Sequence, residues 1–202
     1  MVESGQRAGK LNENFLNVDL FVSAFLKTCE EIRQNVGILI FEFSRFYPSE
    51  YLHVAEFIAD LDRFFDSLPK GWRYGVELRN QDWLKPEYLE CLRRHGIAHV
   101  FNNWEAMPPV IEQLGIPGTN TNENLVAARF LLKPGRAYQA AVKKFQPYER
   151  LQEINPEARA AGKKLIAEGQ AAGTKKKTFI YVNNRLEGNA LETISAMLEA
   201  EP

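Results

Sequence analysis

Five short apolar runs are spaced along the chain, separated by longer segments of mixed polarity. Most of them carry apolar residues at both odd and even positions, so that both faces of the run are hydrophobic. This pattern is typical of strands that are covered on both faces, as in the parallel sheets of α/β proteins. The predicted strands span residues 36–43, 72–79, 97–101, 125–132 and 178–183.

Segments with apolar residues at helical spacing separate these strands. Predicted helices span residues 18–33, 51–68, 86–94 and 189–199, and another begins at Asn155, which can cap a helix with proline in its first turn. The connections 44–71, 80–96, 102–124 and 133–177 are each longer than the dozen or so residues that a parallel crossover needs. The sequence therefore predicts an α/β fold of right-handed β-α-β units with about five parallel strands.

The composition narrows the class of protein. Apolar residues make up 45% of the 202 residues and charged residues 25%, which is ordinary for one globular domain and excludes a disordered chain. The 25 basic and 26 acidic residues give a net charge of −1, which argues against a protein that coats nucleic acid or an anionic membrane. We expect a flexible segment over residues 1–14 and a single domain over residues 15–200.

The cellular setting also follows from the sequence. The polar start of the chain lacks the apolar stretch of a signal peptide, and no apolar run is long enough for a membrane span. Cys29 and Cys91 do not form a disulfide framework, and we expect two buried thiols in a reducing compartment. The sequence therefore predicts a cytoplasmic protein with no membrane part.

Polar and charged residues gather where the predicted strands end. Because the carboxyl ends of parallel strands meet at one edge of a sheet or barrel, ligands of α/β proteins bind there. We expect a ligand site among these residues, which are Glu42, Glu77, Arg79, Asn102, Arg129, Asn183, Asn184 and Arg185.

The alternation along the strands makes this expectation more specific. In the run 72–79, apolar residues that must meet helices alternate with Glu77 and Arg79, which therefore point into a barrel or toward the other face of the sheet. By the parity of their strands, Glu42 ends an otherwise apolar row, Arg129 shares a face with apolar residues, and Asn183 points inward. We expect these five side chains to converge.

Two interpretations of such a convergence remain open. Arginines bind oxyanions with paired donors, so Arg79 and Arg129 could hold an anionic or phosphorylated substrate that Asn183 orients, while Glu77 or Glu42 acts as acid or base. Alternatively, the charges form a structural ion-pair network that fills the interior. An open cleft lined by unpaired groups would favour the first interpretation.

Two further features could bind a ligand. The junction after the last predicted strand places Asn184 and Arg185 before a glycine and a helix start, where free N–H groups favour anions. The alternative is a plain turn capped by Asn189. Trp83 follows a strand end and could stack on a substrate ring, or it could pack beneath a loop.

The sequence shows no recognisable metal or cofactor motif. His53, His95 and His99 are too dispersed for a metal triad, and the two cysteines lack the spacing of a zinc site. A phosphate-binding Walker loop and a dinucleotide fingerprint are also absent. We therefore expect neither a metal nor a cofactor.

Two segments resemble a known family. Residues 75–83 (GVELRNQDW) resemble the "vElRn..W" motif of the YecE-like proteins, the domain-of-unknown-function family 72, and residues 179–190 (FIYVNNRLEGNA) resemble its terminal "vyvNN...G.A" segment. Residues 36–43 resemble its central "gilfqf" strand, with Glu42 where Gln is common. The resemblance covers about residues 11–198. It implies a TIM-type (β/α) barrel and no particular activity, because the family is uncharacterised.

The resemblance also implies a partial barrel. Family members begin with three further strands, with "GtsgW" and "NstFY" motifs, whereas this sequence matches the last five of the eight β/α units. An arc of five strands cannot close and exposes two strand edges. We expect the chain to be marginally stable, to self-associate or to need a missing N-terminal barrel part.

Three functions remain open at this point. The first is an enzyme that acts on a phosphorylated or otherwise anionic substrate. A second is a non-catalytic module that binds phosphate-bearing ligands, including nucleic acid. The third is an inactive barrel fragment.

Overall fold

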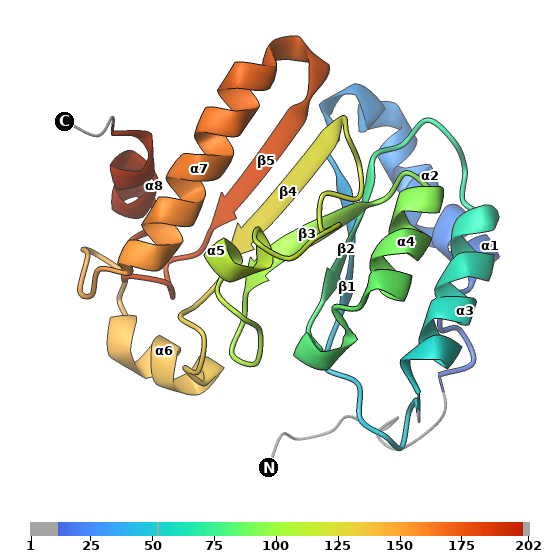
Figure 1. Ribbon diagram of the computed structural model, residues 1–202, viewed down its shortest axis with the longest axis horizontal. Helices are drawn as coiled ribbons and strands as arrows, with labels where there is room; N and C mark the ends of the chain where they lie inside the picture. The colour runs from blue at the N-terminus through green and yellow to red at the C-terminus, as the bar shows by residue number, and fades with distance from the viewer. Residues whose placement is uncertain (1–11, 52, 200–202) are drawn as a thin grey trace.

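The fold is an open parallel sheet with helices along it (Figure 1). The computed structural model describes residues 12–51 and 53–199. The strand order is β1-β2-β3-β4-β5, and every neighbouring pair is parallel. The strands are β1 (Leu39–Phe43), β2 (Tyr74–Leu78), β3 (Ala98–Asn103), β4 (Leu125–Phe130) and β5 (Lys177–Val182). All five predicted strands are present, and β1 and β5 are the edges of a sheet that does not close into a barrel.

Helices occupy the connections between the strands. They are α1 (Val18–Leu20), η1 (Phe21–Leu26), α2 (Lys27–Cys29), η2 (Glu30–Asn35), α3 (Val54–Asp66), η3 (Gln81–Trp83), α4 (Pro86–Arg94), α5 (Val110–Gln113), α6 (Tyr138–Phe145), α7 (Pro156–Ala172), η4 (Gly173–Lys175) and α8 (Ala190–Leu198). The first four are consecutive and form the helical stretch predicted over 18–33. The sequence did not predict α6, which lies inside the longest connection.

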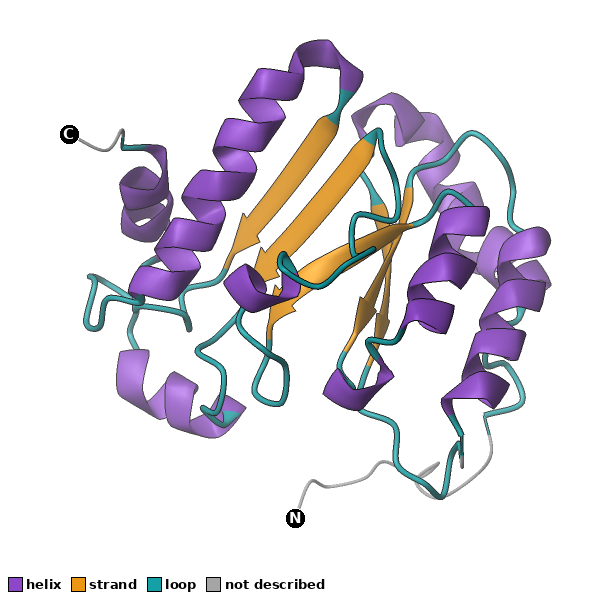
Figure 2. Ribbon diagram, viewed as in Figure 1, coloured by secondary structure: helices purple, strands orange, loops and turns teal. Residues whose placement is uncertain are grey.

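The sheet turns sharply between β2 and β3. Only Gly75 with Ala98 and Val76 with His99 are in register there, whereas β1 and β2 are aligned over the whole of β1. The sheet therefore has two arms. Figure 2 shows α3 and α4 beside the β1–β2 arm, and α7 beside the β4–β5 arm.

The hydrophobic core lies between the sheet and these helices. Phe57, Leu61 and Phe65 of α3 are almost fully buried against the β1–β2 arm. Ala161 and Leu165 of α7 are likewise buried against β4 and β5. Burial of a large apolar side chain contributes about 1.5–3 kcal/mol. On the opposite, inner face, apolar side chains such as Ile38 and Val100 lie close to Gly75, and the charged residues lie farther along, at the carboxyl ends of the strands.

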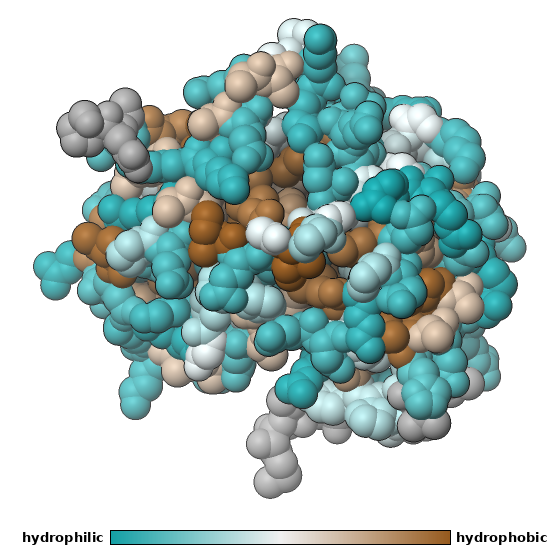
Figure 3. All heavy atoms as spheres, in the orientation of Figure 1, coloured by the Kyte–Doolittle hydropathy of each residue, from teal (hydrophilic) through white to brown (hydrophobic). Residues whose placement is uncertain are grey.

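The outer surface is mostly hydrophilic. Figure 3 shows hydrophilic atoms over most of the face drawn, with hydrophobic atoms in a band across its middle, around α5. The short α5 covers less of the sheet than the long α7 does (Figure 1). Among the helices of residues 12–51 and 53–199, none combines the length and the hydropathy of a bilayer span.

A hydrophobic groove follows the open edge at β1. Its volume is about 630 Å³, and it lies between β1 and the helical stretch 18–35. The helical side includes Leu20, Phe21 and Phe25, and the strand side includes Ile40 and Glu42. We call this feature the edge groove.

Candidate functional site

Four charged side chains from three strands meet on the inner face of the sheet. They are Glu42 of β1, Glu77 of β2, Arg79 directly after β2, and Arg129 of β4, and we call them the strand-end cluster. Glu42 and Glu77 are in register on neighbouring strands. Two adjacent carboxylates repel each other unless cations lie between them. The two arginines provide those cations.

Each arginine of the strand-end cluster binds both carboxylates. Arg79 Nη2 lies 2.8 Å from Glu42 Oε1, and Arg79 Nε donates to Glu77 Oε1 at 2.9 Å. Arg129 Nη1 donates to Glu42 Oε2 at 2.6 Å and also to Glu77 Oε2. The four formal charges therefore cancel in a closed ring of ion pairs.

Exposure falls steeply across the ring. The Glu42 side chain is 38% exposed and that of Arg129 25%, whereas Arg79 is 10% exposed and Glu77 is fully buried. Burial lowers the pKa of Arg129, but hydrogen bonds and charge attraction from Glu42 and Glu77 outweigh it and raise that pKa above its ordinary value. Arg129 therefore keeps its charge, and Glu42 is the member that solvent reaches most easily.

A polar hollow lies beside Arg79, at the carboxyl ends of β1, β2 and β3. Its volume is about 460 Å³, within the range of about 300–1,000 Å³ that is common for small-ligand sites. Trp104 supports Arg79, with the guanidinium carbon 3.7 Å from the ring centroid. We call this feature the strand-end hollow; its lining residues are Arg45, Arg79, Asn80, Gln81, Asp82 and Ala106.

Asn102 lies next to this charge network. It is fully buried on β3, in register with Arg129 of β4. Its Nδ2 donates to the Leu78 carbonyl at 3.0 Å, whereas its Oδ1 is buried without a hydrogen-bond partner among the described residues. Tyr181 of β5 is in register with Arg129 on the other side. Burial raises the pKa of the Tyr181 hydroxyl, and Arg129 opposes part of that rise.

The remaining predicted site residues have other contacts. Asn183 Oδ1 accepts a bond from the Arg185 amide at 3.0 Å, and Asn184 Oδ1 accepts one from Ala190 at 2.7 Å, so that both asparagines shape the loop before α8. The Arg185 guanidinium lies 4.6 Å from the centre of the Tyr138 ring. Within the described part of the chain, neither asparagine nor Arg185 forms a hydrogen bond or ion pair with the strand-end cluster.

Trp83 also lies away from the charged residues. It is buried in the core between the sheet and α3, and it stacks on Phe46 with ring centroids 5.3 Å apart. It also packs against Phe57 of α3. The structure therefore gives Trp83 the packing role that was the alternative interpretation of its position.

One buried carboxylate was missed by sequence reasoning. Glu187 is fully buried in the loop before α8, where it accepts hydrogen bonds from the Asn155 amide, the Arg159 guanidinium and the Thr193 hydroxyl. It thereby ties this loop to the first turn of α7 and to α8. No local pattern around Glu187 points to Arg159, because Arg159 lies on α7, 28 residues earlier in the chain.

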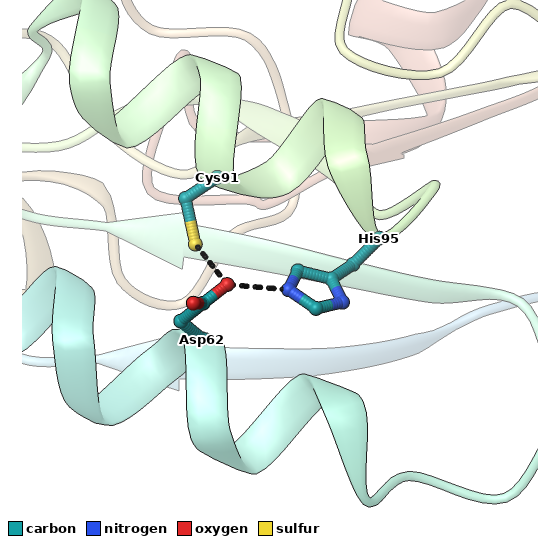
Figure 4. Close-up of side chains that lie close together, drawn as sticks. All are labelled: Asp62, Cys91 and His95. Atoms are coloured by element: carbon teal, nitrogen blue, oxygen red, sulfur yellow. Dashed lines mark hydrogen bonds and ion pairs between the residues drawn. The ribbon is translucent and has the colours of Figure 1, made fainter.

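A second missed cluster lies between α3 and α4. Asp62 of α3 lies close to Cys91 and His95 at the end of α4 (Figure 4). The sequence predicted Cys91 as a buried thiol and His95 as a residue at a helix end. The one available signal was their spacing of four residues, which places both side chains on the same face of a helix.

The fold and the polar inner edge define a class, the parallel β/α proteins with charged residues at the carboxyl ends of their strands. The chain matches the family described as "Protein of unknown function DUF72" over residues 8–201. It belongs to this family, as the resemblance in its sequence indicated.

Solved structures support the assignment of the fold. One similar structure is a DUF72 family protein from Enterococcus faecalis, with 19% identity, a TM-score of 0.59, and coverage of 92% of this chain and 71% of that chain. Another is a DUF72 family protein from Thermotoga maritima, with 20% identity, a TM-score of 0.56, and coverage of 86% and 61%. Among curated proteins, none matches this sequence.

Proposed function

We propose that the protein binds a small phosphorylated or carboxylated ligand at the strand-end cluster, beside the strand-end hollow, and that Glu42 gives up its place to this ligand. The observation that carries the proposal is the position of the Glu42 carboxylate. Arg79 Nη2 and Arg129 Nη1 reach it from two different strands at 2.8 and 2.6 Å. Two guanidiniums that converge on a carboxylate can bind the oxygens of a phosphate in the same way.

Exposure distinguishes the two glutamates. Glu77 is fully buried between the arginines, so its departure would leave a carboxylate without solvation, which is costly. Glu42 lies on an edge strand with 38% of its side chain exposed, and water can solvate it after it leaves. In this proposal Glu77 holds the two arginines in position, and Glu42 exchanges with the ligand.

The charges that remain favour an anion. Without Glu42, Arg79 and Arg129 outnumber Glu77 by one positive charge. Arg45 and Asp82, which also line the strand-end hollow, cancel each other. A net positive charge in a partly enclosed site attracts an anion and strengthens its hydrogen bonds.

Substitution of Glu42 tests this exchange. Glu42→Gln should bind inorganic phosphate about tenfold more tightly than the unchanged protein, which corresponds to about 1.4 kcal/mol, because the internal competitor loses its charge. Titration calorimetry at constant ionic strength measures both affinities. Glu90→Gln on α4, where an exposed glutamate pairs with Arg93, is the matched control and should leave the affinity unchanged.

Two results would refute the exchange. One is equal phosphate affinity in the unchanged protein and in Glu42→Gln. The other is phosphate binding that survives Arg79→Gln at full strength, because Arg79 joins the strand-end cluster to the strand-end hollow.

A second candidate function is catalysis on the same anionic ligand, with Glu42 as the general acid or base. The exposed position of Glu42 favours it over the buried Glu77 for this role. A screen of phosphate monoesters distinguishes the two functions. In an enzyme of this kind Glu42→Gln loses turnover while it keeps or gains affinity, whereas in a binding protein no variant turns over.

A further inference from the structure

Three side chains that bind metals in proteins meet between α3 and α4. Figure 4 shows the Asp62 carboxylate between the Cys91 thiol and the His95 ring. His95 Nε2 lies 2.7 Å and Cys91 Sγ 3.9 Å from Asp62 Oδ1. Ligand atoms of all three residues lie within 4.8 Å of one another. Because α4 ends here and leads into β3, this group lies toward the amino ends of the strands, away from the strand-end cluster.

We propose that Asp62, Cys91 and His95 form a binding site for a divalent metal ion of the zinc type, which fastens α3 to α4. Thiolate, imidazole and carboxylate are the ligands that Zn²⁺ prefers, with bonds of about 2.3 Å to sulfur and about 2.0–2.2 Å to nitrogen and oxygen. In a tetrahedron these bonds place the ligand atoms about 3.3–3.6 Å apart. The observed separations from Asp62 Oδ1 are 2.7 and 3.9 Å, so small side-chain rotations suffice, and water completes the coordination.

The surroundings hold the histidine ring in a fixed orientation. His95 Nδ1 lies 3.7 Å from Asp66 Oδ1, while Nε2 faces Asp62. A carboxylate on the nitrogen that does not bind the metal is the usual outer partner of a zinc-bound histidine. Phe65 packs edge-on against the ring with centroids 5.6 Å apart, and the His95 side chain is only 11% exposed. Little conformational freedom is therefore left to lose when a metal binds.

One cation competes for the site. Arg94 Nη2 donates to Asp62 Oδ1 at 2.7 Å, which is the oxygen that also faces His95 and Cys91. The Arg94 side chain is 55% exposed and can turn into solvent. Asp62 Oδ2 has no hydrogen-bond partner among the described residues. Removal of the Arg94 charge should therefore strengthen metal binding.

Cobalt and zinc test the site directly. The protein, in a buffer without phosphate or chelator, should bind one Zn²⁺ per chain in equilibrium dialysis. Co²⁺ in its place should give the intense absorption of a cobalt–thiolate bond. Cys91→Ser should lose that absorption, and Cys29→Ser, which changes the other cysteine, should keep it. Zn²⁺ should raise the melting temperature of the unchanged protein and of Cys29→Ser, but not that of Cys91→Ser.

A second variant is expected to gain affinity, and a gain cannot result from unfolding. Arg94→Met removes the competing cation from an exposed position and should tighten Zn²⁺ binding about threefold or more, which corresponds to about 0.7 kcal/mol. The proposal fails if the protein binds no Zn²⁺. It also fails if the cobalt–thiolate absorption survives Cys91→Ser, or if Arg94→Met binds Zn²⁺ no more tightly than the unchanged protein.

Discussion

His99 of β3 is a polar ring in an apolar setting. It is 2% exposed, and both of its ring nitrogens are buried without a hydrogen-bond partner among the described residues. The hydroxyl of Tyr88, whose ring meets His99 edge-on at 6.1 Å, is buried and unpartnered in the same way. Burial lowers the pKa of His99 to about 4. The folded protein therefore holds this ring neutral well below the pH at which a free histidine takes up a proton.

Acid should destabilise the protein through His99. The unfolded chain binds a proton near pH 6.5, whereas the folded state does so only near pH 4, so stability falls as pH drops through this window. His99→Phe removes the effect. Between pH 7.5 and pH 4, the difference in unfolding free energy between His99→Phe and the unchanged protein should therefore shift by about 3 kcal/mol in favour of the variant. Urea unfolding at several pH values measures this difference in unfolding free energy. A difference that does not vary with pH would contradict the role of His99.

The loop between β5 and α8 depends on close backbone packing. Gly188 has φ of +113°, and its N–H donates to the Asn184 carbonyl at 2.8 Å. A Cβ at Gly188 would lie 2.6 Å from the Arg150 carbonyl oxygen and 3.1 Å from the Gln152 amide nitrogen. Those atoms belong to backbone that the adjacent Glu187 holds in place, because its carbonyl accepts from Gln152. The loop therefore has no room for a side chain here.

Gly188→Ala should disrupt this element. Both the clash with backbone and the unfavourable φ contribute, and we expect a loss of about 3 kcal/mol or more in the free energy of unfolding. Gly135→Ala is the matched control, since Gly135 has φ of +78° but no atom within 4 Å of the added carbon. It should cost only about 1–2 kcal/mol. Equal losses in the two variants would show that close packing around Gly188 is unimportant.

At the scale of the whole molecule, the open sheet is the dominant feature. Both β1 and β5 are edge strands, and edge strands readily pair with other chains. In the edge groove beside β1, Leu20 is 45% exposed and Phe25 is 50% exposed. Apolar surface next to an unpaired strand favours association, so self-association, one of the three outcomes expected from the sequence, is the one that we test here.

Charge in the edge groove should weaken that association. We expect the average mass of the protein in sedimentation experiments to rise with concentration, and Phe25→Lys should shift this rise to higher concentration. Leu191→Lys, at a residue 78% exposed on α8, is the control and should have no such effect. A single monomeric species at every concentration, with a sharp thermal transition, would contradict this expectation.

The strands and the direction of their side chains were determined by the sequence. Runs that are apolar on both faces can be buried only in a covered sheet, so the five strands were predictable. Alternation along a strand is a local property of the extended backbone. The alternation therefore predicted that Glu42, Glu77, Arg79 and Arg129 converge, although it does not say which of them pair with each other.

Only the tertiary structure decided how these groups are paired. Strand register set Glu42 beside Glu77 and so closed the ring of ion pairs, a pairing that the sequence left open between a ligand site and a structural ion-pair network. The packing of α3 on α4 brought Asp62 to Cys91 and His95, and the packing of α7 and α8 brought Arg159 to Glu187. Such contacts join residues far apart in the chain. They depend on how helices and strands fit against one another, which no local pattern of residues encodes.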